Sequence, residues 1–192
     1  MQAFADLIDR LNAAEGPERA RLEAQIWDTF GTEQAVLVLD MSQFSLSVRR
    51  DGILPYLGHI RRMQRLMSPV VEAHGGRVVK FVADNLFGTF TTVQAAVDAA
   101  LAMNATLTEH RAGFAIAIGI DYGRFLLLPE GDAWGDPINA ACKLGEDLAG
   151  PGEILLTRAA RLALPADYPR PFVEHRASVS GIEVVVHSLR TA

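Results

Sequence analysis

The order of apolar segments along the chain restricts its fold more than any other feature of the sequence. Residues 35–40 (AVLVLD) have the length and branched side chains of a buried strand, and residues 53–73 have the apolar spacing of a helix. Residues 76–90 (GRVVKFVADNLFGTF) predict two strands, because alanine, aspartate and asparagine at 83–85 interrupt the apolar runs with a turn-like composition. Helical spacing returns at residues 92–108, so strands and helices alternate.

The apolar runs further along the chain extend this pattern. Residues 114–121 (FAIAIGID) and 124–129 (RFLLLP) predict a second hairpin that turns near Tyr122 and Gly123. The C-terminal part adds one helix and two strands, at residues 137–148, 153–157 and 181–190. This order predicts an α+β fold with a ferredoxin-like βαββαβ core, additional C-terminal strands and helices on one face of the sheet. The other apolar face needs cover, and we expect a second copy of the chain to supply it.

The N-terminal part predicts a helical extension before this core. Residues 3–13 and 18–30 each place apolar side chains on one helical face, and Gly31 is expected to end the second helix. We therefore divide the chain into an extension, residues 1–33, and a main domain, residues 34–192. The extension is expected to pack against the domain, and a lid or a clamp between two copies remains open.

Composition limits the classes of function. The 192 residues are 49% hydrophobic with a net charge of −5, which suits a globular domain and argues against a nucleic-acid-binding surface. A single cysteine, Cys142, excludes an internal disulfide and indicates a reducing compartment. The sequence contains neither an apolar run long enough to span a membrane nor a basic, apolar leader. These features predict a cytoplasmic protein without a membrane or nucleic-acid partner.

Two aspartates stand at chemically important positions in the apolar core. Asp40 ends the first predicted strand, and Asp84 lies in the turn of the first hairpin. We expect the first strand to pair with the first strand of that hairpin, which would bring the two carboxylates together. Neighbouring carboxylates repel each other unless a cation lies between them. Oxygen ligands suit Mg²⁺, and paired carboxylates holding two metals are typical of phosphoryl and nucleotidyl transfer.

Four segments resemble, in this order, the catalytic domain of class III nucleotidyl cyclases, the adenylate and guanylate cyclases. They are VLVLDMSQFS, HGGRVVKFVADNLFGTF, IGIDYGRF and DAWGDPINAACKLGEDLAGPGEILLT. The resemblance covers about residues 34–190. It implies a cyclase that uses two divalent metal ions, Mg²⁺ or Mn²⁺, and converts a ribonucleoside triphosphate to the 3′,5′-cyclic monophosphate and pyrophosphate.

The resemblance assigns roles at the metal and phosphate end of the site. Asp40 and Asp84 match the two metal-binding aspartates, and Met41 would offer its backbone carbonyl to a metal. Phe44 and Ser45 match the loop that wraps the phosphates and packs near the base. The sequence departs from the family at Gln43 and Ala83, where glycine is usual, so a different shape of the phosphate loop is expected.

The resemblance also assigns the base-reading and catalytic residues. Lys80 and Asp132 match the lysine and the acid that read the base, and Asn139 matches the asparagine that orients the ribose. Lys143 stands where an arginine usually stabilises the transition-state phosphate. Because lysine lacks the planar fork of arginine, weaker stabilisation is expected. In this family each site lies between two chains, which implies a homodimer. One chain gives Asp40 and Asp84 with the metals, and the other gives Lys80, Asp132, Asn139 and Lys143.

Several alternatives remain. A donor at Lys80 and an acceptor at Asp132 suit adenine, so ATP is the expected substrate, but cytosine presents the same edge. A cyclic pyrimidine nucleotide synthase of bacterial antiphage defence, using CTP or UTP, is the first alternative, and an inactive nucleotide-binding domain is the second. An RNA-binding module is disfavoured by the acidic composition and aliphatic strands. The Gly-Gly-Asp/Glu-Glu-Phe hairpin of diguanylate cyclases is absent from the sequence.

Overall fold

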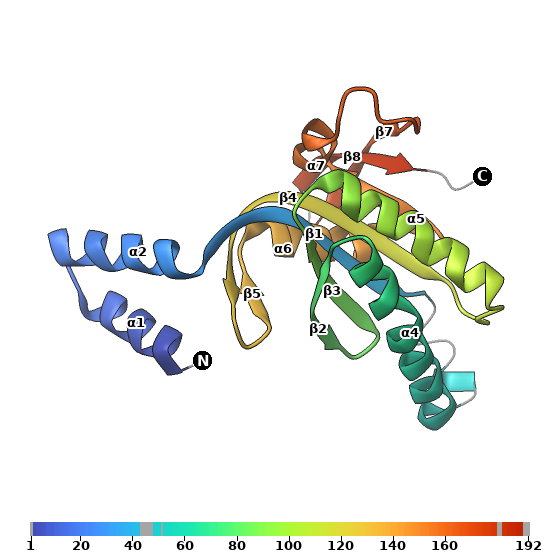
Figure 1. Ribbon diagram of the computed structural model, residues 1–192, viewed down its shortest axis with the longest axis horizontal. Coiled ribbons are helices and arrows are strands. Elements are labelled where there is room, and N and C mark those ends of the chain that lie inside the picture. The colour runs from blue at the N-terminus through green and yellow to red at the C-terminus, as the bar shows by residue number, and fades with distance from the viewer. Residues whose placement is uncertain (1, 43–47, 51, 180–181, 190–192) are drawn as a thin grey trace.

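The computed structural model describes residues 2–42, 48–50, 52–179 and 182–189 (Figure 1). The described residues form an eight-stranded sheet in the order β2-β3-β1-β4-β6-β8-β7, with the short β5 paired to β4. Its strands are β1 Gly31–Met41, β2 Arg77–Val82, β3 Asn85–Phe90, β4 Ile116–Leu128, β5 Asp132–Trp134, β6 Ile154–Thr157, β7 Val173–Val179 and β8 Ile182–Leu189. Only the β4–β6 pair is parallel among the described pairings.

The described helices lie on both faces of this sheet and in an N-terminal arm beside it. They are α1 Gln2–Ala13, α2 Gly16–Phe30, α4 Ile53–Ala73, α5 Val93–Glu109, α6 Asp136–Cys142, the π-helical η1 Lys143–Leu148 and α7 Arg158–Ala163. Alternate residues of β1 explain the two layers. Leu37 and Leu39 join the core that contains α4, α5 and α7, whereas Val36 and Val38 join a smaller core with Ile138 of α6. The predicted α+β fold is confirmed, but the expectation of helices on one face of the sheet was wrong, because α6 and η1 cover the second face.

The predicted helix–hairpin–helix order of the core is also confirmed, with one change of pairing. β1 pairs antiparallel with β3, the second strand of the hairpin, and not with β2 as expected. The register Leu39↔Leu86 still places the end of β1 beside the β2–β3 turn. Because β3 begins at that turn, pairing with either strand brings the same end of the hairpin to Asp40.

The second hairpin predicted near Tyr122 and Gly123 was wrong. Residues 116–128 form one continuous strand, β4, which pairs with β1 from Gly31↔Leu126 to Met41↔Ile116. Gly123 belongs to this strand, where a Cβ would lie 3.0 Å from Cγ of Pro137 in α6. Glycine at this position therefore permits the close approach of α6 and does not mark a turn.

The crossing of α6 and η1 over β1 and β4 depends on a second glycine, Gly119. A Cβ on Gly119 would overlap the carbonyl oxygen of Ala141 and would lie 2.6 Å from the backbone nitrogen of Gly145. We expect Gly119→Ala to lower the free energy of unfolding by about 2–3 kcal/mol, because backbone atoms cannot yield as a flexible side chain can. Urea unfolding of the purified wild-type and variant chains would measure this change in the free energy of unfolding.

Gly58 in α4 offers a matched control for that substitution. A Cβ at Gly58 meets nothing within 4 Å, so Gly58→Ala should raise the free energy of unfolding by roughly 0.5–1 kcal/mol. Equal stability of the Gly119→Ala and wild-type chains would contradict the proposed packing of α6 and η1.

The N-terminal helices form an arm beside the sheet (Figure 1). α1 and α2 share their own small core around Leu7, Leu22 and Ile26, against which Leu126 of β4 packs. A cation–π contact, with Arg124 lying 4.3 Å from the ring centroid of Trp27, adds a second connection to β4. Gly31 opens β1 with φ −71°, and a Cβ there would overlap the carbonyl oxygen of Trp27. The second helix ends at Gly31 as predicted, but the backbone there is extended, so this glycine serves close backbone approach.

Candidate active site

The paired strands bring the two predicted metal-binding aspartates to one end of the sheet. Asp40 lies near the end of β1, and Asp84 lies in the β2–β3 turn with 8% of its surface exposed. Burial, together with the charges of Asp84 and Glu146, raises the pKa of Asp40 to about 7. The hydroxyl of Tyr56 in α4 donates a hydrogen bond to Oδ2 of Asp84 at 3.2 Å. The structure thus joins Asp40 and Asp84 electrostatically, as the sequence predicted.

The raised pKa of Asp40 predicts an unusual pH dependence for the metal-free protein. Between the ordinary pKa of 3.8 and about 7, the folded chain binds a proton at Asp40 that the unfolded chain has released. Stability is therefore lost as the pH rises through this window. Asp40→Asn should remove this loss and raise the free energy of unfolding at pH 8 by roughly 2 kcal/mol, a figure already reduced for partial exposure.

Thermal unfolding in EDTA at pH 5 and pH 8 measures this effect. The melting temperatures of Asp40→Asn and wild type should differ more at pH 8 than at pH 5. Asp167→Asn, at an exposed aspartate, is the control and should follow wild type at both values. If the melting temperatures of wild type and Asp40→Asn change equally between pH 5 and pH 8, the placement of Asp40 is contradicted.

The donor atoms at this end of the sheet fit a hard divalent ion. Asp40 and Asp84 supply carboxylate oxygens, and the side-chain oxygen Oδ1 of the neighbouring Asn85 is buried without a hydrogen-bond partner. Within the described part of the chain, no group of three or more His, Cys, Asp or Glu side chains could hold a metal. Two carboxylates suit Mg²⁺, which keeps several positions for water and substrate phosphates.

The predicted base-reading pair is in direct contact. Nζ of Lys80 in β2 lies 2.6 Å from Oδ1 of Asp132 at the start of β5, and about a third of each side chain is exposed. Burial alone would raise the pKa of Asp132, but hydrogen bonds from Lys80 and the Ala133 backbone lower it overall. Lys80 also lies 5.3 Å from the ring centroid of Phe87. Sequence positions 52 apart therefore converge, as the resemblance implied.

The predicted catalytic side chains lie on α6 and at the start of η1. Asn139 is exposed on α6, and Nζ of Lys143 forms an ion pair with Oδ2 of Asp147 at 2.9 Å. The hydrogen bond from Lys143 to Asp147 raises the pKa of Lys143. The predicted single helix over 137–148 changes to π-helical geometry at Lys143, a feature that is frequent at functional sites.

The remaining predicted site residues are less informative. Met41 is buried, and it pairs with Ile116 through the backbone ladder. Phe44 and Ser45 lie outside the described residues. Ala83, which replaces a glycine of the family pattern, adopts φ 50°. The turn before Asp84 therefore keeps a left-handed conformation despite the larger residue.

Two residues near the acids were missed by sequence reasoning. Tyr56 appears in the sequence as one more apolar residue of α4, but its hydroxyl reaches Asp84. Glu146 of η1 accepts a hydrogen bond of 2.7 Å from Nδ2 of Asn85, and it contributes to the raised pKa of Asp40. Only the polar atoms themselves, in otherwise apolar or helical segments, could have drawn attention to them.

Comparison with known proteins agrees with this geometry. No family model matches the chain. An uncharacterized protein of Mycobacterium tuberculosis (strain ATCC 25618 / H37Rv) is 35% identical over 168 residues, covering 87% of this chain and 43% of that protein. A putative adenylate cyclase of Rhizobium meliloti is 28% identical over 130 residues, covering 64% of this chain and 22% of its own length. The chain thus spans less than half the length of these curated relatives.

The solved structures include close matches to the whole fold. An adenylate/guanylate cyclase/hydrolase from Silicibacter pomeroyi superposes with a TM-score of 0.70 at 25% identity, covering 83% of this chain and 95% of that one. No helix in the described part of the chain is both long and apolar enough to cross a membrane. The chain thus has the fold of adenylate and guanylate cyclase catalytic domains, and a putative adenylate cyclase is among its distant relatives.

Proposed function

We propose that the chain converts a ribonucleoside triphosphate, ATP first, to the 3′,5′-cyclic monophosphate and pyrophosphate, at a site that a second copy completes. The observation that carries this proposal is the juxtaposition of Asp40 and Asp84 at the open end of β1, next to the buried, unpaired oxygen of Asn85. Paired oxygen donors of this kind suit the metal ions of in-line phosphorus chemistry.

The chain's own residues have distinct tasks in this reaction. Asp40 and Asp84 would hold Mg²⁺ or Mn²⁺, which supplies neutralisation of the triphosphate and a lower pKa for the ribose 3′-hydroxyl. Asn139 orients the ribose so that the 3′-oxygen bonds to the α-phosphorus as the bond to the pyrophosphate oxygen breaks. The hydroxyl proton passes to water. Lys143 faces the negative charge that develops on the phosphate oxygens.

Base selection is the task of Lys80 and Asp132. Both recorded hydrogen bonds to the Asp132 carboxylate use Oδ1, so Oδ2 can accept from the amino group of a base. Lys80 retains ammonium hydrogens beyond the one directed at Asp132 and can donate to a ring nitrogen. Adenine presents this acceptor and donor side by side. Cytosine presents the same edge, which keeps a cyclic pyrimidine product as the second candidate.

Lys143 is expected to make the enzyme slow. Its ammonium group is engaged by Asp147, and a single point charge replaces the planar fork of arginine. Asp147 also lies four residues further along the same helical segment, so the pair can open without rearranging the backbone. We expect turnover to be reduced and not absent.

Product analysis tests the proposed function. The chain is incubated with ATP, GTP, CTP or UTP in Mn²⁺, and the products are identified by mass spectrometry. Cyclic AMP supports the first proposal, and a cyclic pyrimidine nucleotide supports the second candidate. Release of no cyclic nucleotide from any of the four substrates would contradict both and would leave a nucleotide-binding domain without turnover.

A further inference from the structure

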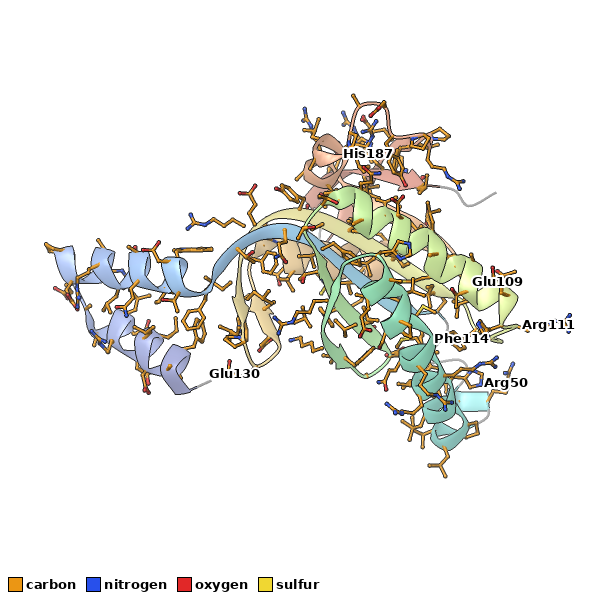
Figure 2. The ribbon with its side chains drawn as sticks, in the orientation of Figure 1. Arg50, Glu109, Arg111, Phe114, Glu130 and His187 are labelled. Atoms are coloured by element: carbon orange, nitrogen blue, oxygen red, sulfur yellow. The ribbon has the colours of Figure 1, made fainter. Side chains whose placement is uncertain are left out.

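A cavity adjoins the acidic end of β1, with Ser42 and Tyr56 among its lining residues. It has a volume of about 760 Å³ and is formed by the start of α4, the end of α5 and the segment leading into β4. Arg50, Arg111 and Phe114 all line it, and Figure 2 shows these three at one end of the molecule. A volume of this size accommodates a small organic ligand.

The lining of this cavity is positive, although the chain as a whole is negative. Arg50, His59 and Arg111 are part of it, and its described lining residues include no aspartate or glutamate. The whole chain carries a net charge of −5, so a described lining with two arginines and no acidic side chain differs from its average composition. Arginine binds oxyanions through a planar fork of donors that matches phosphate and carboxylate groups.

The loop that carries Arg111 is held in a fixed and strained shape. The guanidinium of Arg62 donates to the carbonyl oxygens of His110 at 2.7 Å and Ala112 at 3.1 Å. Arg111 between them adopts φ 47°, a left-handed conformation that glycine would adopt at lower cost. Strained backbone that the surrounding structure fixes is a feature of ligand-binding sites. The strained residue here is Arg111, which lines the cavity.

Aromatic contacts connect the cavity wall to the catalytic acids. The rings of Tyr56 and His59 stack with centroids 6.3 Å apart, and His59 meets Phe114 edge-on at 5.7 Å. Tyr56 is only 5% exposed, and its hydroxyl reaches Asp84. Tyr56 therefore borders both the cavity and the acidic end of β1.

We propose that this cavity binds a small phosphate-bearing anion, with Arg111 and His59 as its recognition residues. The binding needs no metal, because the cavity supplies its own positive charge, and it does not depend on cyclase activity. The phosphate can come from two sources. One is the nucleotide or its pyrophosphate product, and the other is a separate phosphorylated metabolite.

Calorimetric titration with inorganic pyrophosphate in EDTA tests the proposal. Wild type should bind pyrophosphate, and Arg111→Gln should weaken binding by at least about tenfold, the effect of one charge-assisted contact. Arg65→Gln removes an exposed arginine of α4 that does not line the cavity, so its affinity should match wild type. Absence of binding by wild type, or equal loss in both arginine variants, would overturn the proposal.

Two further measurements distinguish the cavity from the catalytic acids, and the nucleotide from a separate metabolite as the source of the phosphate. Asp40→Ala should retain pyrophosphate binding in EDTA, and loss of binding in this variant would place the anion at the catalytic acids and refute the second site. If the phosphate belongs to the nucleotide, Arg111→Gln raises the KM for the triphosphate; if it belongs to another metabolite, KM stays unchanged while binding is lost. A chain that binds pyrophosphate but forms no cyclic nucleotide would refute only the proposed function.

Discussion

Asp40→Ala is expected to reduce cyclic nucleotide formation by at least about a hundredfold while leaving the fold intact. The substitution removes one of the two carboxylates that converge at the end of β1, and with it the electrostatic stabilisation of the transferring phosphorus centre. The fold should persist, because the substitution also removes a carboxylate whose pKa is raised mainly by burial. Product formation in Mn²⁺ and thermal unfolding, measured on the same preparation, check both halves of this expectation.

Binding of Mn²⁺ alone gives the same prediction a readout that does not require turnover. Calorimetry should show binding to wild type and at least about tenfold weaker binding to Asp40→Ala. Asp167→Ala, at an exposed aspartate, should behave as wild type in all three measurements. Normal turnover by Asp40→Ala would show that the paired aspartates are not the metal site.

Convergence of Asp40 and Asp84 was predictable because a hairpin turn lies at a defined end of its strands. The sequence located the turn at 83–85, and pairing of β1 either antiparallel to β3 or parallel to β2 brings the turn to the end of β1. The choice of strand within the hairpin was wrong, since β3 and not β2 pairs with β1. Local sequence does not determine which strand of a hairpin pairs with β1. The site depends only on the position of the hairpin turn beside the end of β1.

The continuous strand β4 could not be predicted from its own residues. Tyr122 and Gly123 have a composition that occurs in turns, and glycine in a strand can equally mark close approach of another element. The second cause applies, because Pro137 of α6 packs over Gly123. That contact joins segments distant in sequence, and it is visible only after the chain has folded.

The electrostatic partners of the site were equally hidden. The Lys80–Asp132 pair followed from the resemblance, whereas the Lys143–Asp147 and Asn85–Glu146 contacts did not. The first of these missed pairs joins residues one helical turn apart, a spacing that many solvent-exposed pairs share. The second joins Asn85 to Glu146 of η1, a π-helical segment that no apolar periodicity indicates.

Complementation between two inactive variants tests the shared site most directly. Asp40→Ala lacks a metal-binding carboxylate, and Asn139→Ala lacks the side chain that orients the ribose. If each site takes its acids from one chain and its asparagine from the other, a mixed dimer contains one site with both residues intact and one with neither. Random pairing makes about half of all dimers mixed, and each holds one intact site of two.

Cyclic nucleotide formation is therefore measured for each variant alone and for their equimolar mixture after subunit exchange. The prediction is two nearly inactive variants and a mixture with about one quarter of the wild-type activity. A doubly substituted chain, Asp40→Ala with Asn139→Ala, is the control and should gain nothing from mixing with either single variant. A mixture no more active than its components, although mixed dimers form, would contradict a site divided between two copies.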